Sequence, residues 1–127
     1  LLAMEYLMTK QEYSELKSAD DEKFYEVLNQ FWKKKDPTPE TNYNEAMAEY
    51  FRRIEYAIVY YRDPQNSNGS LTDRGKIYAL FGAPDKIETK PESDKTIETW
   101  EYSKLKKKII FEVTSAGFYS ITNVIQN

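Results

Sequence analysis

The residues that this chain lacks narrow its chemistry first. It contains no cysteine and no histidine among its 127 residues. The absence of cysteine excludes disulfides, thiolate zinc sites and a cysteine nucleophile. The absence of histidine removes the commonest metal ligand and the commonest general base. We therefore expect no resident metal or cofactor, and many forms of enzyme chemistry are excluded.

The sequence has no large excess of basic or acidic residues, and it has no long apolar run. The 18 basic and 21 acidic residues give a net charge of −3, which argues against a nucleic-acid partner. No run approaches the roughly 20 apolar residues that a membrane-spanning helix needs, and we expect no cleavable apolar leader within the residues given. We expect no transmembrane segment in this chain. The lysines near residues 104–108 are better explained as a solvated hairpin tip than as a phosphate-binding patch.

Helical signals fill the first two thirds of the chain. Thr9 and Glu12 form a capping box that opens a helix of about two turns. A second helix begins within residues 18–21, presents apolar residues at helical spacing up to Trp32, and ends before prolines 37 and 39. The longest helix starts with a cap pattern at residues 42–45 and runs to Arg62. Its predicted buried stripe consists of Tyr43, Met47, Tyr50, Phe51, Ile54, Ile58 and Tyr61.

A short helix over residues 72–82 has complete start and stop signals. Thr72 suits the N-cap, Asp73 suits the positive end of the helix dipole, and Gly82 with Pro84 ends the helix. A polar, turn-rich loop over residues 63–70 precedes it. This short helix therefore marks the change from the helical part of the chain to the strand part.

After Asp85 the pattern becomes that of strands. Residues 86–89, 96–102, 109–113 and 118–125 read as strands joined by short turns, which predicts an antiparallel meander. The sequence thus predicts an α+β fold, in which N-terminal helices pack on a small C-terminal antiparallel sheet of three or four strands. We expect a single domain over residues 1–127, with a helical part at about 9–82 and a strand part at about 86–125. Its predicted core includes Phe31, Trp32, Phe51, Ile54, Leu80, Phe81 and Phe111.

Several motifs together resemble the GWxTD domain family of bacterial proteins, which are usually made as exported, cell-envelope proteins. The resemblance runs from about Tyr6 to Tyr119 and rests on residues 31–39, on Asn44-Glu45 with Tyr50, Arg53 and Ala57, on residues 72–78, and on residues 81–85. The motif that names the family, Gly-Trp-x-Thr-Asp, reads here Gly69-Ser70-Leu71-Thr72-Asp73, so serine stands in place of the tryptophan. The resemblance implies an extracytoplasmic location, in the periplasm or cell envelope, and a chain that is a fragment of a longer envelope protein.

The second half of the chain has a further resemblance. From Gly75 onward it is similar to a helix-then-strands unit of β-lactamase-inhibitory proteins and small envelope assembly lipoproteins, through Ile77, Leu80-Phe81-Gly82, Pro84, Trp100 and Tyr102. Those relatives bind proteins and catalyse nothing. The resemblance therefore implies a binding role.

Six polar residues lie on the family-like motifs and have two explanations. They are Asp36, Glu45, Arg53, Asp73, Arg74 and Asp85. Paired carboxylates in a cleft would suit acid–base catalysis. Caps, turns beside proline and arginine forks explain the same residues as a structural polar network, and we favour this explanation. We assign no catalytic residue and no metal ligand, and the acidic run Asp20-Asp21-Glu22 is read as a helix cap.

Eleven tyrosines and two tryptophans suggest a binding surface. Tyr56, Tyr60 and Tyr119 fit the core stripes poorly and are expected to be exposed. Trp100, Tyr102 and Tyr119 are expected to form an exposed, partner-binding face of the sheet. These five aromatic residues are our candidates for the binding site.

The favoured function is a non-enzymatic binding or scaffold domain of an exported bacterial cell-envelope protein, with another protein or an envelope polymer as partner. The alternative is a hydrolase that acts on cell-wall carbohydrate or peptide with Asp/Glu catalysis. A third hypothesis is a purely structural domain that supports its parent protein.

Overall fold

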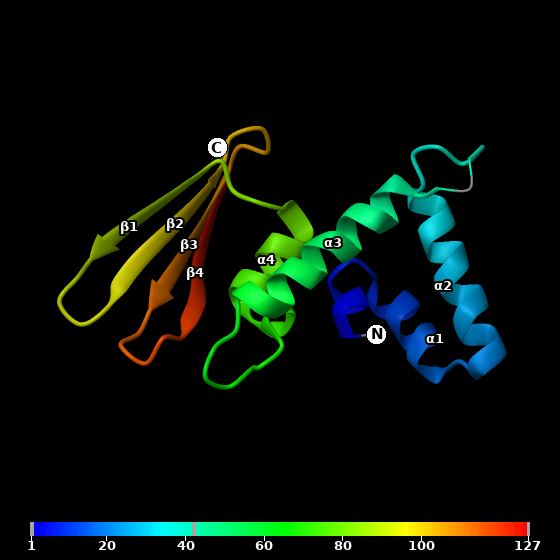
Figure 1. The fold of residues 1–127 in the computed structure, drawn as a ribbon, viewed down its shortest axis with the longest axis horizontal. Coiled ribbons are helices and arrows are strands. Elements are labelled where there is room, and N and C mark those ends of the chain that lie inside the picture. Colours follow the sequence, from blue (N-terminus) through cyan, green and yellow to red (C-terminus); the bar gives the residue numbers. More distant parts are fainter. Residues whose placement is uncertain (1, 42, 127) are drawn as a thin grey trace. The chain divides into compact units, whose positions relative to one another are not determined.

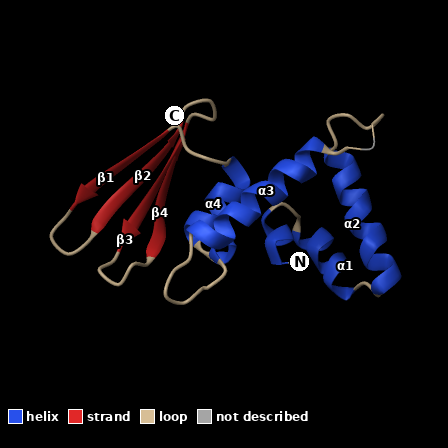
Figure 2. Ribbon diagram, in the orientation of Figure 1, coloured by secondary structure: helices blue, strands red, loops and turns tan. Residues whose placement is uncertain are grey.

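The computed structural model describes residues 2–41 and 43–126 of the chain. In these residues four α-helices come first and a four-stranded antiparallel sheet follows, which confirms the α+β class (Figure 2). The chain divides into two compact units, residues 1–52 and 53–127, and the boundary between them lies within one helix. Whether the chain unfolds as a single cooperative domain stays a prediction.

The first unit begins with the short 3-10 helix η1 (Leu2–Tyr6) and continues with α1 (Lys10–Ser18) and α2 (Asp21–Lys35). The predicted capping box is confirmed, because the Thr9 side chain accepts from the Glu12 N–H and the Glu12 carboxylate accepts from the Thr9 N–H. Asp20 caps α2 by accepting from the Lys23 N–H at 2.9 Å, as expected of the acidic run. The first unit ends within α3 (Glu45–Tyr60).

Position 42, where we placed the start of the α3 cap pattern, lies outside the described residues. Asn44, within the predicted cap pattern, supplies the cap: its side chain accepts from the Met47 N–H at 3.0 Å and donates to the Trp32 carbonyl at 2.7 Å. One side chain therefore starts α3 and attaches it to the end of α2.

The buried stripe of α3 lies differently around the helix than predicted. Tyr50, Ile54 and Ala57 are buried, whereas Tyr43 and Met47 are exposed and the Phe51 side chain is 39% exposed. Successive helix residues are about 100° apart, so Phe51 lies well away from the line through Tyr50 and Ile54. The prediction that Phe51 is a core residue is wrong. Burial also raises the pKa of Tyr50 well above its ordinary value.

The second unit continues from α3 through the 3-10 helix η2 (Gly69–Leu71) into α4 (Asp73–Phe81). The start and stop signals of α4 are confirmed: Thr72 caps its N-terminus, and Gly82 adopts a φ of 77° at its C-terminus. Part of the segment predicted as a loop is therefore η2, where Gly69 and Ser70 are buried.

The four strands lie side by side in chain order, β1-β2-β3-β4 (Figure 1). They are β1 (Lys86–Pro91), β2 (Thr96–Tyr102), β3 (Lys107–Val113) and β4 (Tyr119–Gln126). Every neighbouring pair is antiparallel, and a register shift interrupts the β3–β4 pairing between Ile110 and Phe111. The predicted meander is confirmed.

One face of the sheet packs against α4 to form a core. Its buried members are Ile77, Trp100, Tyr102, Ile109 and Phe111, and partly buried Phe81, Tyr61, Tyr78, Tyr119 and Ile121 surround them. The strand register places Trp100 directly beside Ile109. Two residues further along each strand, Tyr102 and Phe111 point to the same face and are also buried. Within the described part of the chain, no helix is both long and apolar enough to cross a membrane.

Candidate functional site

Thr72 joins three segments of the second unit. Its hydroxyl lies 2.9 Å from the carbonyl oxygen of Tyr61, at the end of α3, and 2.8 Å from that of Gly69 in η2. The same oxygen accepts from the Gly75 N–H in the first turn of α4 at 3.1 Å. The Thr72 side chain is buried, so these contacts are shielded from water. Thr72 is therefore a structural junction as well as a helix cap.

Two glycines allow the backbone to close around this junction. A Cβ at Gly75 would lie 1.9 Å from the Gly69 carbonyl oxygen, and a Cβ at Gly69 would lie 2.0 Å from the Ala57 carbonyl oxygen. Real Cβ atoms do not approach backbone atoms so closely. The segment therefore requires glycine at both positions because of close packing.

Asp73 and Arg74 connect the start of α4 to β4. The Asp73 carboxylate accepts from the Ile121 N–H at 2.8 Å. The Arg74 guanidinium lies over the Tyr119 ring at 3.5 Å from its centroid and over the Tyr61 ring at 5.0 Å. Both residues have structural contacts, as predicted, but these contacts attach the helix to the sheet.

The other four residues of the predicted polar network also make structural contacts, at separate places. In the first unit, the Thr38 hydroxyl donates to the Glu45 carboxylate at 2.8 Å, and Asp36 accepts from the Thr38 N–H. In the second unit, Arg53 donates to the Leu80 carbonyl at 3.2 Å, and Asp85 accepts from the Ser103 N–H at 2.6 Å. Within the second unit, the motif carboxylates do not pair, because Asp73 lies at the start of α4 and Asp85 follows its end.

Three tyrosines form a stack, which we call the tyrosine stack: Tyr60, Tyr56 and Tyr78. The Tyr56 ring stacks on Tyr60 with centroids 4.4 Å apart and on Tyr78 with centroids 4.7 Å apart. Tyr56 is 42% exposed and Tyr60 63% exposed, as the sequence predicted. The stack therefore begins at the partly buried Tyr78 and reaches solvent at Tyr60.

Tyr61 links the tyrosine stack to the core. Its ring lies 5.4 Å from Tyr78 and 5.5 Å from Trp100, measured between centroids. Burial raises the pKa of the Tyr61 phenol to about 12. Tyr61 therefore connects the exposed end of the stack, through Tyr78, to the buried Trp100.

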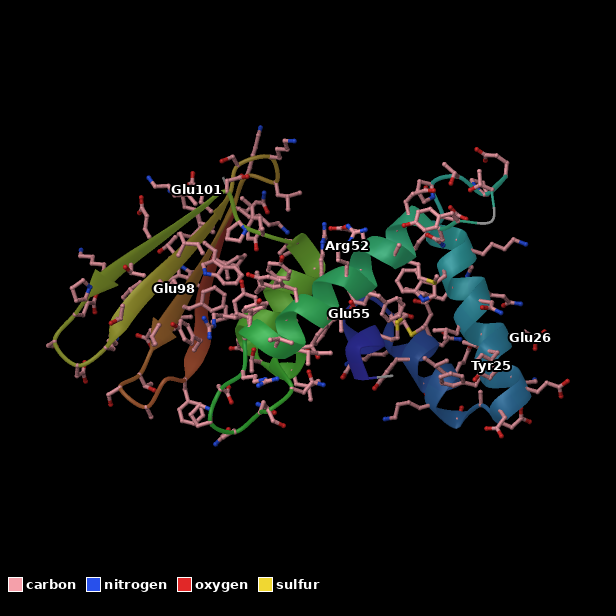
Figure 3. The ribbon with its side chains drawn as sticks, in the orientation of Figure 1. Tyr25, Glu26, Arg52, Glu55, Glu98 and Glu101 are labelled. Carbon is pink, nitrogen blue, oxygen red and sulfur yellow. The ribbon has the colours of Figure 1, made fainter. Side chains whose placement is uncertain are left out.

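The predicted binding face of the sheet needs correction. Trp100 is 1% exposed and Tyr102 4% exposed, so neither lies on a surface open to a partner. Trp100 donates from Nε1 to Glu98, a neighbour on β2 that Figure 3 labels, and the Tyr102 hydroxyl donates to the Gly82 carbonyl at 2.7 Å. Burial raises the pKa of Tyr102 well above its ordinary value. Tyr119 is half-buried beneath Arg74.

A pocket of about 390 Å³ lies beside the C-terminal end of α4. Its lining includes Arg53, Lys104 and Asp85, with apolar walls from Leu80, Phe81 and Leu105. Two of these polar groups have partners in the fold, since Arg53 donates to the Leu80 carbonyl and Asp85 accepts from the Ser103 N–H. Among the described residues, no group of three or more acidic side chains could hold a metal ion.

A comparison with protein-family models shows to which family the chain belongs. A family model of the GWxTD domain matches residues 1–122. The chain belongs to the GWxTD domain family. Comparisons with curated proteins and with solved structures gave no match.

The structure gives a physical role to the GWxTD-like segment of this chain. Gly69 allows the close approach to α3, Thr72 caps α4, and Asp73 binds β4. Ser70 is buried, and its hydroxyl donates to the Asn68 side chain at 2.6 Å. Because Ser70 is only 2% exposed, a tryptophan side chain at this position would have to displace neighbouring atoms. This segment of the GWxTD domain therefore connects α3, α4 and the sheet.

The sequence singled out Tyr56 and Tyr60, but it missed two contributors to the candidate site, Tyr61 and Tyr78. Tyr56 and Tyr60 are four residues apart on one helix, and that spacing was a usable signal for their contact. Tyr78 and Tyr61 complete the aromatic group of this GWxTD domain through contacts that join α3 to α4. Nothing in the local pattern of α4 signals that Tyr78 stacks on Tyr56.

Proposed function

We propose that this GWxTD domain is a non-enzymatic binding module of an exported bacterial cell-envelope protein, and that it contacts another protein or an envelope polymer through the tyrosine stack. The extracytoplasmic setting rests on the family. The site rests on one observation, the stack of three rings whose outer member, Tyr60, is 63% exposed.

Tyrosines are suited to such a role. They provide a large contact area with few rotatable bonds, and the phenol hydroxyl adds a hydrogen-bonding group. Tyr56 is held between two other rings, so little conformational entropy is lost when a partner contacts its exposed edge. The exposed Val59 extends the apolar part of this surface on the same helix. A peptide or a sugar face can stack on Tyr60, the exposed outer ring of the stack.

The hydrogen bonds of the motif carboxylates favour a binding role over a hydrolase. A glycosidase-type mechanism needs two carboxyl groups that flank one bond. In this chain Asp73 accepts from a strand amide, Asp85 from a turn amide and Glu45 from a threonine hydroxyl. Each of these carboxylates thus makes a structural hydrogen bond, and each makes it to a different segment of the chain.

The test compares two exposed tyrosines. Tyr60→Ala removes the outer ring of the stack, whereas Tyr25→Ala removes an equally exposed ring on α2, labelled in Figure 3. Both variants and the wild type are measured for co-sedimentation with isolated peptidoglycan and for capture of proteins from an envelope extract. We expect Tyr60→Ala to weaken the interaction by about tenfold or more, as for an aromatic hot spot, and Tyr25→Ala to leave it unchanged.

Two results would contradict the proposal. One is binding that Tyr60→Ala and Tyr25→Ala weaken equally, which would place the contact elsewhere. The other is turnover of peptidoglycan or oligosaccharide that disappears in Asp73→Asn or Glu45→Gln while the fold is retained, which would favour the hydrolase.

A further inference from the structure

The two edges of the sheet differ in their chemistry. β1 forms one edge, and it carries Lys86, Glu88 and Lys90 and ends at Pro91. β4 forms the other edge and carries no charge; indeed no charged residue follows Glu112 in the chain. Charged side chains and proline on an edge strand prevent it from pairing with a strand of another molecule. β1 therefore has this protection, and β4 lacks it.

The outer half of β4 is open to solvent. Asp73 accepts from the Ile121 N–H, so the start of α4 occupies the first part of this edge. From Thr122 to Gln126 the side chains are exposed, including the apolar Val124 and Ile125. Within the described residues β3 is the strand that neighbours β4. The outer side of residues 122–126 thus presents backbone donors and acceptors of the kind that bind an added strand.

We propose that residues 122–126 of β4 pair with the same residues of a second copy of this chain, antiparallel about a twofold axis. The two four-stranded sheets then join into one continuous sheet. This interface is separate from the tyrosine stack and does not depend on the binding function proposed for it.

A second copy is the occupant that the charges favour. In a twofold antiparallel pair residue i faces residue j of the second copy and j faces i, so a central residue faces its own symmetry mate and every facing pair is drawn from the same strand. For β4 this places only uncharged Thr, Asn, Val, Ile and Gln side chains across the interface. The same pairing of β1, centred on Glu88, would place Glu88 opposite Glu88 and Lys86 opposite Lys90, and like charges directly opposite are destabilising.

The same asymmetry limits the assembly to two copies. A sheet with two open edges can add further copies without end and form a fibre, whereas one open edge is used up when two copies pair. Pairing through five residues buries a small interface, which belongs to the weak and transient class. We expect a reversible dimer.

The experiment uses the chain of residues 1–127 and two matched variants. Ile87 and Val124 lie in one cross-strand row at opposite edges of the sheet, and each is 51% exposed. Sedimentation velocity from about 10 µM to 1 mM should show a dimer whose population rises with concentration, as expected of a small interface. Val124→Lys should raise the dimer Kd by about tenfold or more, because each interface gains two like charges, and Ile87→Lys should leave it unchanged.

Hydrogen exchange of the unmodified chain gives a second, independent readout. Protection of those amides of residues 122–126 that point away from β3 should increase with protein concentration, while that of the amides in β1 stays constant. A monomer throughout the concentration range would overturn the proposal, as would a dimer that Ile87→Lys weakens as much as Val124→Lys. Protection of the outward-pointing amides of residues 122–126 at every concentration in a monomer would mean that the chain covers this edge itself, and that result also overturns it.

Discussion

The carboxylate of Asp73 accepts a hydrogen bond of 2.8 Å from the backbone N–H of Ile121, forty-eight residues further along the chain. This bond attaches the first turn of α4 to β4. It also gives the aspartate of the GWxTD-like segment a structural role that its position in the first turn of α4 does not reveal. The stability of the second unit should therefore depend on this carboxylate.

Asp73→Ala should lower the free energy of unfolding by about 1–3 kcal/mol, because a partly buried backbone donor loses a charged acceptor. Asp73→Asn keeps an acceptor oxygen and should cost less, roughly 0.3–1 kcal/mol, from the lost charge at the helix N-terminus. Urea unfolding measures both values. Asp21→Ala is the control, since Asp21 is an exposed first-turn residue of α2. Equal effects of Asp73→Ala and Asp21→Ala would show that the bond to Ile121 contributes nothing.

Gly75→Ala should be strongly destabilising. The new Cβ would lie 1.9 Å from the Gly69 carbonyl oxygen, so the backbone of η2 or α4 must move, at a cost of about 2–4 kcal/mol. Gly117→Ala separates this effect from a general cost of replacing glycine: Gly117 has a φ of 89° but no atom near the new Cβ, and its strain should cost about 1 kcal/mol. Thermal unfolding of the two variants ranks them. A Gly75→Ala protein as stable as Gly117→Ala would contradict the close approach.

Stability should fall at high pH as Tyr61 ionises. The pKa of its phenol is raised from the ordinary 10.0 to about 12 by burial, so between these values the folded state holds a proton that the unfolded state has released. The contribution is fully present below pH 10 and is lost as the pH rises through about 12, by on the order of 1–3 kcal/mol. Tyr102 and Tyr50 shift in the same direction for the same reason.

Urea unfolding at pH 9 and pH 11 measures this loss. Tyr61→Phe has no ionisable phenol and should lose less stability between the two pH values than the wild type does. An identical loss in both proteins would assign the alkaline effect to other groups.

Phe111→Ala and Phe51→Ala test the corrected core. Phe111 is fully buried against Trp100, with ring centroids 5.0 Å apart, so its truncation should cost about 3–5 kcal/mol. Phe51 is 39% exposed and should cost clearly less, about 1–2 kcal/mol. Chemical denaturation with a two-state fit gives both values. The reverse order would restore the stripe that the sequence predicted for α3.

Local chemistry determined much of this fold without the structure. The capping box of Thr9 and Glu12, the Thr72 cap and the Gly82 stop act within a few residues, so their outcomes could be predicted. The alternation in residues 109–113 and the short turns also implied the antiparallel meander. These local signals were sufficient to predict the α+β class.

Tertiary packing decided which aromatic side chains are exposed. Alternation shows that Trp100 and Tyr102 share a face of β2, but it does not show that α4 covers that face, so we placed both on the surface. For the same reason the periodicity of α3 could not separate Phe51 from Tyr50. A periodic pattern defines a face, and only the neighbouring element defines whether that face meets solvent.

The sequence by itself determined the helices and strands, their order, and the residues that end them, because these depend on contacts between near neighbours. Only the tertiary structure decided that Asp73 reaches Ile121 and that Tyr78 stacks on Tyr56. It also decided that the uncharged strand β4 forms an edge of the sheet. These relationships join residues that are far apart in the chain. They depend on how the second unit packs, which no local pattern specifies.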